Sequence, residues 1–445
     1  MRIRHRILSC VFLVLGSLVL GSKIASVVAQ NPPSSFDRDR ARTMLNVIKG
    51  DIKKNYYDPT FRGIDIDARF KEAEEKINKG TSQGQLLGII AQALLDFGDS
   101  HTYFIPPDKP YTVEYGWQMQ MIGDKCYITA VKPRSDAEAK GLKEGDEVYT
   151  IDGFGPVREN LWKILYTYHA LRPKPGVRME VIKPNGQQQQ IDVLAKVTQG
   201  KRVMDISGGG GGVDLMDLIR KQESEDRLNR HIYYELEDAL LWKMPAFDLD
   251  EAKVDDMVAK AKKRNAVILD LRGNGGGFEI TLLRMISNFF DRDVKLGDIK
   301  RRKETKPLIA KTRGANAFTG KLIVLIDSRS GSAAELFARV VQLEKRGIVI
   351  GDVSAGAVMR AKSYDHEVGI DTVAFYGASI TDADIIMADG KSLEHVGVVP
   401  DGLKLPKPSD LAAKLDPVLS YAASLAGIKI SPEKAGAMFP IEWKK

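Results

Sequence analysis

Two short apolar runs that end in unusual turns constrain the fold of this chain more than any other feature. The first, Ala266-Val-Ile-Leu-Asp-Leu-Arg272, leads into Gly273-Asn-Gly-Gly-Gly277, and the second, Leu322-Ile-Val-Leu-Ile326, leads into Asp327-Ser-Arg-Ser-Gly-Ser332. Short apolar runs that end in such turns are typical of strands. From Ala239 to about Leu405 such strands alternate with helical stretches, which predicts an α/β domain. Both turns are then expected at the same edge of one sheet.

The glycines and Ser332 decide what chemistry these turns allow. Glycine clusters let the backbone approach a ligand closely and point N–H groups inward, which suits an oxyanion hole. Ser332 is expected at a strand-to-helix turn, where the helix N-terminus favours developing negative charge. However, Ser332-Ala-Ala-Glu335 also fits the Ser-x-x-Glu capping box, so a plain N-cap serine explains the same spacing. Local sequence leaves both interpretations open.

The first 29 residues have the pattern of an export signal. A basic start from Met1 to Arg6 precedes an apolar core from Ile7 to Leu20 and a small-residue exit before Gln30. Cleavage is expected after Ala29, with an uncleaved membrane anchor as the alternative. In both cases we expect export to a periplasmic or extracellular space. Removing the leader lowers the formal net charge from +7 to +3, which gives no electrostatic case for nucleic-acid binding.

The rest of the chain has enough apolar material for two or three packed domains, since 43% of its 445 residues are hydrophobic. Apolar residues at helical spacing between 36 and 97 predict helices, and alternating runs such as Trp117 to Ile122 and Cys126 to Val131 predict strands. The predicted order is a leader (1–29), a helical domain (30–108), a β-rich module (109–200), a glycine-rich connector and helix (201–238), an α/β domain (239–405), and a C-terminal helix and tail (406–445).

A serine nucleophile needs a base, because its hydroxyl is a poor nucleophile at neutral pH. Of the five histidines after the leader, His101 is notable because Phe97-Gly-Asp-Ser-His-Thr-Tyr-Phe104 places it in a tight turn just past a predicted helix end. A histidine in a turn is also commonly a plain surface residue. Glu394 is a candidate to orient the imidazole, or else a solvated loop acid. Composition and spacing alone do not bring Ser332, His101 and Glu394 together.

One stretch of the β-rich module resembles a PDZ domain. It reads Ile128-Thr-Ala-Val-Lys-Pro-Arg-Ser-Asp-Ala-Glu-Ala-Lys-Gly-Leu-Lys-Glu-Gly-Asp-Glu-Val-Tyr-Thr-Ile-Asp-Gly153, with a helix opening near Ser135 between two strands. The resemblance implies binding of extended peptides as an added strand, with capture of a free terminal carboxylate. A generic β-module that acts as a spacer is the alternative.

A series of motifs resembles the tail-specific, C-terminal-processing serine peptidase family, in the family's order and over nearly the whole chain after the leader. The motifs are Asn55-Tyr-Tyr-Asp-Pro59, Gly98-Asp-Ser-His-Thr102, the PDZ-like stretch, Ile268-Leu-Asp-Leu-Arg-Gly-Asn-Gly-Gly-Gly277, Gly331-Ser-Ala-Ala-Glu335, Ile350-Gly-Asp352 and Val396-Gly-Val-Val-Pro-Asp401. The resemblance implies a crotonase/Clp-like α/β catalytic domain with Ser332 as nucleophile. It also implies an oxyanion hole from the N–H of Ala333 and of a glycine such as Gly275 or Gly276.

The resemblance also bears on the base. In the Ser/Lys branch of the family, the position of the lysine corresponds to Ala357 in this chain, and nearby Lys362 would need a shifted backbone. Another branch, which looks like the tricorn core protease and the chlamydial protease-like factor, uses Ser, His and Glu. His101 and Glu394 occupy the positions of the His and the Glu in that branch. The resemblance therefore implies acyl transfer, with His101 as the base and Glu394 as the acid that orients its imidazole. The implied partners are polypeptides, recognised in part through their C-terminal tails.

The sequence also bears on three other interpretations. A dinucleotide site is disfavoured because the last glycine of G-x-G-x-x-G would fall on Phe278. No metal or other cofactor is expected, because the only local ligand cluster is Asp365-His366-Glu367 and three adjacent residues rarely face one ion. A catalytically inactive binding protein for peptides or apolar ligands stays open, because the resemblance extends to retinoid-carrying interphotoreceptor proteins.

Overall fold

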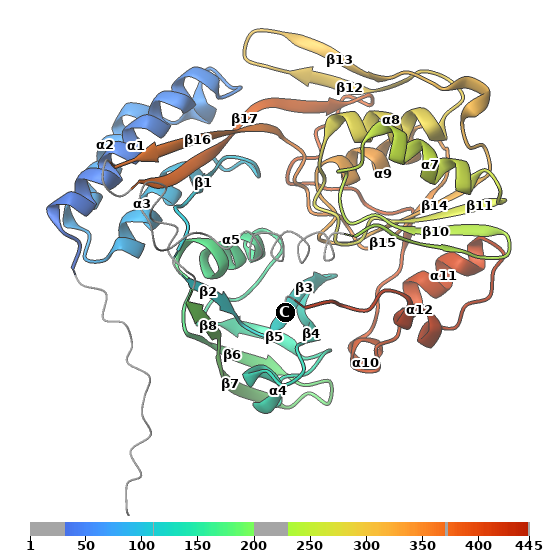
Figure 1. Cartoon of the computed structure of the whole chain (residues 1–445), viewed down its shortest axis with the longest axis horizontal. Helices are drawn as coiled ribbons and strands as arrows, with labels where there is room; N and C mark the ends of the chain where they lie inside the picture. The colour runs from blue at the N-terminus through green and yellow to red at the C-terminus, as the bar shows by residue number, and fades with distance from the viewer. Residues whose placement is uncertain (1–31, 110, 200–229, 370–372, 444–445) are drawn as a thin grey trace, which may run out of the picture.

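The computed structural model describes residues 32–109, 111–199, 230–369 and 373–443 of the chain (Figure 1). The predicted leader with its cleavage after Ala29 lies outside these residues, and so do residues 201–229 of the predicted glycine-rich connector and helix. Within the described ranges, no helix is both long enough and apolar enough to cross a bilayer.

Helices predicted from apolar spacing are present at the start of the described chain. They are α1 (Ser35–Asn55), η1 (Phe61–Gly63), α2 (Ile66–Lys79) and α3 (Gln83–Leu95). The side chains of Ser34, Asp65 and Ser82 accept hydrogen bonds from the first free N–H groups of α1, α2 and α3, which explains where these helices begin. Their buried faces, including Ile48 and Ile90, meet in one hydrophobic cluster.

Antiparallel strands follow in the segment predicted to be β-rich. Its sheet has the order β3-β4-β5-β6-β7, and the strand predicted over Trp117 to Ile122 is confirmed as β3. Alternate residues of β3 are buried, which is the pattern of a sheet with one covered face. The elements are β2 (Tyr111–Glu114), β3 (Trp117–Ile122), β4 (Lys125–Val131), α4 (Asp136–Ala139), β5 (Glu147–Ile151), α5 (Leu161–Tyr166), η2 (Thr167–Leu171), β6 (Gly176–Ile182), β7 (Gln188–Leu194) and β8 (Lys196–Gln199).

The α/β part is built on a sheet with the order β18-β15-β14-β11-β10-β9. All its pairings are parallel except that of β9, which lies before the predicted start of this domain at Ala239. The strands are β9 (Ile232–Glu235), β10 (Ala239–Lys243), β11 (Ala266–Asp270), β14 (Lys321–Ile326), β15 (Ile348–Gly351) and β18 (Gly402–Leu403); the helices between them are α7 (Glu251–Ala261), α8 (Glu279–Phe289) and α9 (Ala333–Leu343).

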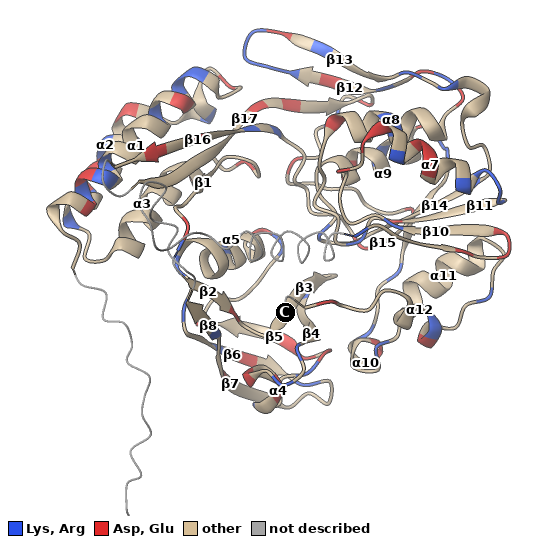
Figure 2. Cartoon of the chain, in the orientation of Figure 1, with Lys and Arg blue, Asp and Glu red and all other residues tan. Residues whose placement is uncertain are grey.

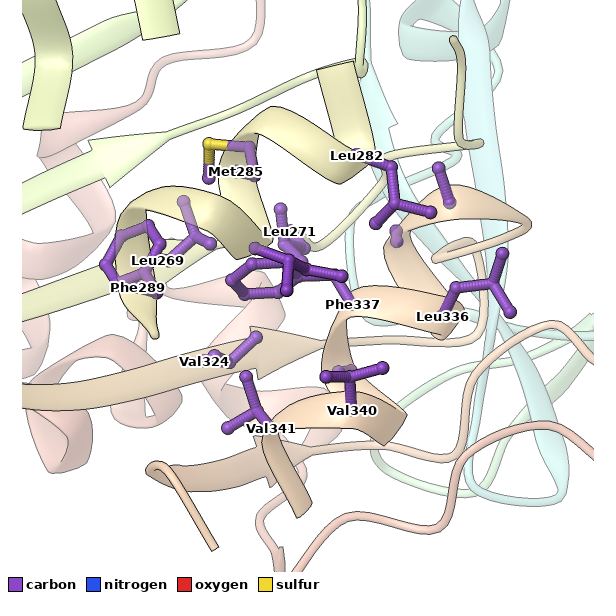
Figure 3. Packing of buried hydrophobic residues seen from close by; sticks show 14 of the residues in the cluster. Leu269, Leu271, Leu282, Met285, Phe289, Val324, Leu336, Phe337, Val340 and Val341 are labelled. Carbon is purple, nitrogen blue, oxygen red and sulfur yellow. The ribbon is translucent and has the colours of Figure 1, made fainter. Parts of the chain in front are cut away.

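Helices cover both faces of this sheet, which explains why its inner strands β11 and β14 are almost entirely buried and apolar. Leu269 of β11 belongs to the cluster under α7, α8 and α9, whereas its neighbour Ile268 packs with the C-terminal helices on the opposite face. Figure 3 shows Met285 of α8 and Phe337 of α9 in the first cluster. In Figure 2 the blue and red segments, which mark Lys, Arg, Asp and Glu residues, are concentrated outside strands β11 and β14.

The prediction of one helix and a tail after residue 405 is wrong in part. The structure has three short helices there: α10 (Pro408–Ala412), α11 (Pro417–Leu425) and α12 (Pro432–Met438). Each has a proline in its first turn, and such prolines divide the apolar pattern into pieces that are too short to predict. Leu419 and Ala435 are fully buried, and Asp416 pairs with Arg272 at 2.7 Å, so the segment is part of the core.

A second sheet joins the N-terminal helices to the α/β part (Figure 1). Its long central strand β17 packs against the helical cluster through Tyr376 and Ile380, and against the α/β cluster through Ile385 and Met387. Because β1 pairs with β17, the turn between α3 and β1 is brought to the α/β part. The strands are β1 (Tyr103–Ile105), β12 (Val294–Lys300), β13 (Thr305–Ala310), β16 (Arg360–Val368) and β17 (Ala374–Met387).

Candidate active site

The two special turns leave the sheet side by side, as predicted. Strands β11 and β14 are parallel neighbours with Asp270 opposite Leu325, so both turns begin at the same edge. The N–H of Gly331 donates to the carbonyl of Asn274 at 2.8 Å, which joins the serine-containing turn to the glycine-rich one. The two turns therefore form one unit.

Ser332 has a backbone conformation that serine rarely adopts, with φ 52° and ψ −119°, directly before α9. Its N–H donates to the carbonyl of Ala357 at 2.8 Å and to the carboxylate of Glu335 at 3.0 Å. The second bond belongs to the predicted capping box, but an ordinary N-cap residue has an extended backbone. Capping therefore explains the position of the Glu335 side chain but not the strained backbone of Ser332. Backbone strain of this kind is typical of functional turns.

Gly276 lies against Ser332, although not in the predicted role. A Cβ on Gly276 would lie 2.5 Å from the Cβ of Ser332 and 3.1 Å from the nitrogen of Ala333, so only glycine fits here. The N–H of Gly276, expected in the oxyanion hole, instead donates to the side chain of Asn274 at 2.8 Å. Gly276 thus lets the glycine-rich turn lie close to Ser332. Gly275 and Ala333 are the remaining predicted N–H donors of the oxyanion hole.

The turn that carries His101 is organised by the buried carboxylate of Asp99. This carboxylate accepts the N–H groups of His101 (3.0 Å) and Thr102 (2.7 Å). It also accepts hydroxyl hydrogen bonds from Tyr56 (2.8 Å) and from Thr381 of β17 (2.7 Å). The turn is therefore held rigidly between the helices and β17.

Ser100, which sequence reasoning missed, stands between His101 and Glu394. Its hydroxyl oxygen is 2.7 Å from Nδ1 of His101 and 2.9 Å from Oε2 of Glu394, and its N–H donates to Oε1 of Glu394 at 2.7 Å. The prediction placed Glu394 directly behind the imidazole. In the structure Glu394 reaches His101 through a serine hydroxyl, and the only sequence signal was that Ser100 precedes His101 in the turn motif.

The protonation of this group follows from its hydrogen bonds. A carboxylate only accepts, so the Ser100 hydroxyl donates to Glu394 and must accept from Nδ1–H of His101. Nε2 of His101 is then left as an acceptor. Burial lowers the pKa of His101 below its ordinary 6.5, and the charges of Glu394 and Asp99 oppose this shift only in part. The imidazole is therefore neutral at neutral pH, as a general base must be.

Glu335 holds the loop that faces Ser332. Its buried carboxylate accepts the hydroxyl of Ser354 (2.6 Å) and the N–H groups of Gly356 (2.7 Å) and Ala357 (2.9 Å), in addition to that of Ser332. Burial raises the pKa of Glu335 to about 7, and these hydrogen bonds oppose the shift. The side chain that the sequence assigned to a helix cap therefore organises the site as well.

One peptide group links Ser332 to Glu394. The carbonyl of Ala357 accepts from Ser332, and the N–H of the next residue, Val358, donates to Oε2 of Glu394 at 2.9 Å. Among the described residues, no direct hydrogen bond joins the side chains of Ser332 and His101. Catalytic hydrogen bonds are often long before substrate binds. All three predicted residues therefore belong to one connected group.

The structure places the other candidate residues elsewhere. Lys362 is exposed on β16, opposite Ile380 of β17. His366 of the Asp365-His366-Glu367 run is bonded through Nε2 to Asp51 of α1 at 2.6 Å. Within the described part of the chain, no group of three or more His, Cys, Asp or Glu residues is arranged to hold a metal ion.

The β-rich module contacts both loops that flank Ser332. Gln120 of β3 donates to Asp327 at 2.7 Å, in the turn that leads to Ser332. The guanidinium of Arg158 donates to both oxygens of Asp352 at 2.8 Å, and the N–H of Gly123 donates to the same carboxylate at 2.9 Å. The module is thus hydrogen-bonded to both loops that flank Ser332.

Replacing Arg158 by alanine is expected to lower the free energy of unfolding by about 2 kcal/mol, because it leaves the nearly buried Asp352 without its cation. Urea unfolding measures this. Arg178→Ala is the matched control, since Arg178 and Asp192 form a pair that is more than half exposed, and a loss below about 1 kcal/mol is expected there. Equal losses in the two variants would contradict the role given to Arg158.

Comparison with known proteins agrees with this geometry. Residues 240–403 match the model of Peptidase family S41. These matched residues, the S41 segment, cover the α/β sheet except for β9, and they include Ser332 and Glu394 but neither His101 nor the β-rich module. Together with the relatives below, it points to a serine peptidase, a hydrolase.

Curated relatives extend the similarity beyond this segment. The chain is 22% identical to a tail-specific protease of Haemophilus influenzae over 75% of this chain and 49% of the relative. It is 25% identical to the carboxy-terminal processing protease CtpA of Bacillus subtilis over 52% of each. It thus spans about half the length of these relatives. It is also 24% identical to the chloroplastic carboxyl-terminal-processing peptidase 3 of Arabidopsis thaliana, over 84% of this chain and 72% of the relative.

Among solved structures, that of mature CPAF superposes with a TM-score of 0.64 at 13% identity, covering 92% of this chain and 100% of the other. At this identity the likeness concerns the fold alone. The mixed α/β architecture of the chain is therefore one that it shares with mature CPAF.

Proposed function

We propose that this chain is an exported serine endopeptidase of the tail-specific, C-terminal-processing type. Ser332 is the nucleophile, His101 the general base, and Glu394 the acid that stabilises the imidazolium through Ser100. The observation that carries this proposal is the continuous set of hydrogen bonds from Ser332 through one peptide group to Glu394, and from Glu394 through Ser100 to His101. Export rests on the pattern of the first 29 residues.

In the proposed mechanism, the hydroxyl of Ser332 attacks a peptide carbonyl while its proton passes to Nε2 of His101. The imidazolium that forms keeps donating its Nδ1–H to the Ser100 hydroxyl, which keeps its own proton and donates it in a hydrogen bond to the Glu394 carboxylate. The oxyanion accepts hydrogen bonds from the N–H groups of Ala333 and Gly275; that of Ala333 opens α9 and has no partner within the helix. The imidazolium then protonates the leaving amine, and water releases the acyl-enzyme.

The β-rich module is proposed to be a PDZ domain that binds the tails of substrates. Two features support this. Strand β3 lies at the edge of the sheet, where an extended peptide can add as a further strand. The short helix α4, capped by Ser135, lies between β4 and β5 as the resemblance to a PDZ domain implies. The hydrogen bonds from Gln120 and Arg158 to the catalytic loops would connect such binding to the site.

The proposal is tested with a fluorophosphonate probe, which reacts only with an activated serine. We expect covalent labelling at Ser332, located by peptide mass mapping, and loss of labelling in His101→Ala because the base is removed. His169→Ala, which changes an exposed histidine of the β-rich module, is the control and should label like the unmodified chain. An unlabelled chain that binds apolar ligands tightly would instead be a carrier.

A further inference from the structure

His395 follows Glu394 and has a left-handed backbone, with φ 62°, which is unfavourable for a residue with a side chain. Its N–H donates to the carbonyl of Gly356 at 2.8 Å, in the loop that Glu335 holds. Its imidazole is 57% exposed, yet Nε2 lies 2.7 Å from the carbonyl oxygen of Gly98. A strained residue with one specific side-chain bond calls for a functional explanation.

The carbonyl that His395 contacts begins the turn of the proposed base. Gly98 has φ 66°, and Asp99, Ser100 and His101 follow it directly. The same carbonyl accepts Nη1 of Arg62 at 3.0 Å. Arg62 also has a left-handed backbone, with φ 54°. Two strained residues, one from the N-terminal helices and one from the S41 segment, therefore donate to one oxygen.

We propose that His395 is a positioning residue for His101, an inference that rests on the proposed function. The pair Glu394 and His395 holds the turn at two points, because Glu394 accepts from Ser100 while His395 donates to Gly98. A loop that contributes both the acid and this donor fixes the distance between acid and base. Positioning of this kind matters because a displacement of about 1 Å in a catalytic group can cost about a hundredfold in rate.

The bond does not depend on the charge of His395. Nε2 carries a proton both in the imidazolium and in the neutral tautomer that donates to a carbonyl, so the donor is kept in either state. Of the described side chains, the acid that forms an ion-pair contact with His395 is Glu394, whose Oε1 is 3.6 Å from Nε2. His395 therefore acts through the position of the turn and not through its charge, so its loss should change kcat and leave KM nearly unchanged.

The test compares His395→Gly with His395→Gln on an unstructured peptide substrate. Glycine accepts φ 62° without strain but has no donor, so His395→Gly should lower kcat about tenfold with KM within about twofold, and should unfold at an equal or higher temperature. A merely structural histidine would not give lower kcat together with equal or higher stability. Glutamine places an amide N–H near the position of Nε2, so His395→Gln should recover most of the lost kcat.

The outcomes separate this inference from the proposed function. If the unmodified chain cleaves peptides and His395→Gly has the same kcat, the positioning role is wrong and the proposed function stands. If His395→Gly loses kcat but His395→Gln does not recover it, the donor explanation is wrong. If the unmodified chain neither cleaves peptides nor reacts with the fluorophosphonate probe, the proposed function fails, and the inference fails with it.

Discussion

Ser332→Ala is expected to lower kcat for a C-terminally tailed peptide by at least about a thousandfold while the chain remains folded. The variant removes the attacking oxygen, and the hydrogen bonds through which Ser332 holds Ala357 and Glu335 use its backbone N–H and survive. Alanine tolerates φ 52° no better and no worse than serine, so the thermal midpoint should stay close to that of the unmodified chain. Peptide hydrolysis followed by chromatography, with thermal unfolding in parallel, measures both quantities.

Ser328→Ala is the matched control for this prediction. Ser328 lies in the same turn, and its hydroxyl donates to the carbonyl of Met121 in the β-rich module. Loss of that bond removes one contact between module and turn but no reacting atom, so most of the activity should remain. If Ser332→Ala cleaves the peptide as fast as the unmodified chain, Ser332 is not the nucleophile.

Glu335→Gln is expected to lower the free energy of unfolding by about 2–4 kcal/mol and to reduce hydrolysis as well. The four groups that bond this buried carboxylate all donate, so an amide in its place would direct its own N–H₂ group at other donors and leave at least one buried N–H unpaired. The loop of Gly356 and Ala357 would then lose its position beside Ser332. Urea unfolding and kcat/KM for the same peptide measure the two losses.

The control for this variant is Glu344→Gln, at the other end of the same helix. Glu344 pairs with Arg292, whose side chain is 61% exposed, so its loss should cost less than about 1 kcal/mol. Similar losses in the two variants would contradict the buried role of Glu335.

The pH dependence of Glu335 offers an independent check. Its pKa in the folded chain, about 7, lies above the ordinary 4.5, so the folded state binds the proton more tightly than the unfolded state. This group's contribution to stability is therefore fully present below about pH 4.5 and is lost as the pH rises through about 7. Unfolding measured across this range should show a component that disappears in Glu335→Gln. An identical pH dependence in both proteins would rule out the raised pKa.

The rate of hydrolysis should rise over the same pH range in which the contribution of Glu335 to stability falls. The loop beside Ser332 needs the charged carboxylate as its acceptor, and the lowered pKa of His101 favours the neutral imidazole that the proposed base role requires. Hydrolysis is therefore expected to rise with pH through about 7, in the range where the contribution of Glu335 to stability falls.

The features that could be predicted from the sequence are those that depend on residues close together in the chain. The runs that became β11 and β14 were recognisable because strands buried on both faces leave no polar alternation. The helix after Ser332 was recognisable from its capping pattern, and the tight turn of His101 from its place after a helix end. These are local rules, and the choice of Ser332, His101 and Glu394 as candidate site residues depended on the family resemblance in addition.

The connections among these residues depend on contacts between distant parts of the chain, which appear only in the tertiary structure. The bond between Ser100 and Glu394 joins residues 294 apart in the chain, and it exists because β17 carries the turn of His101 to the α/β part. No local pattern predicts which side chain will fill the space between two distant loops. The sequence therefore did not indicate Ser100, and it predicted direct contact between Glu394 and the imidazole, where the Ser100 hydroxyl lies between them. For the same reason the sequence could not show that the N–H of Gly276 is taken by Asn274.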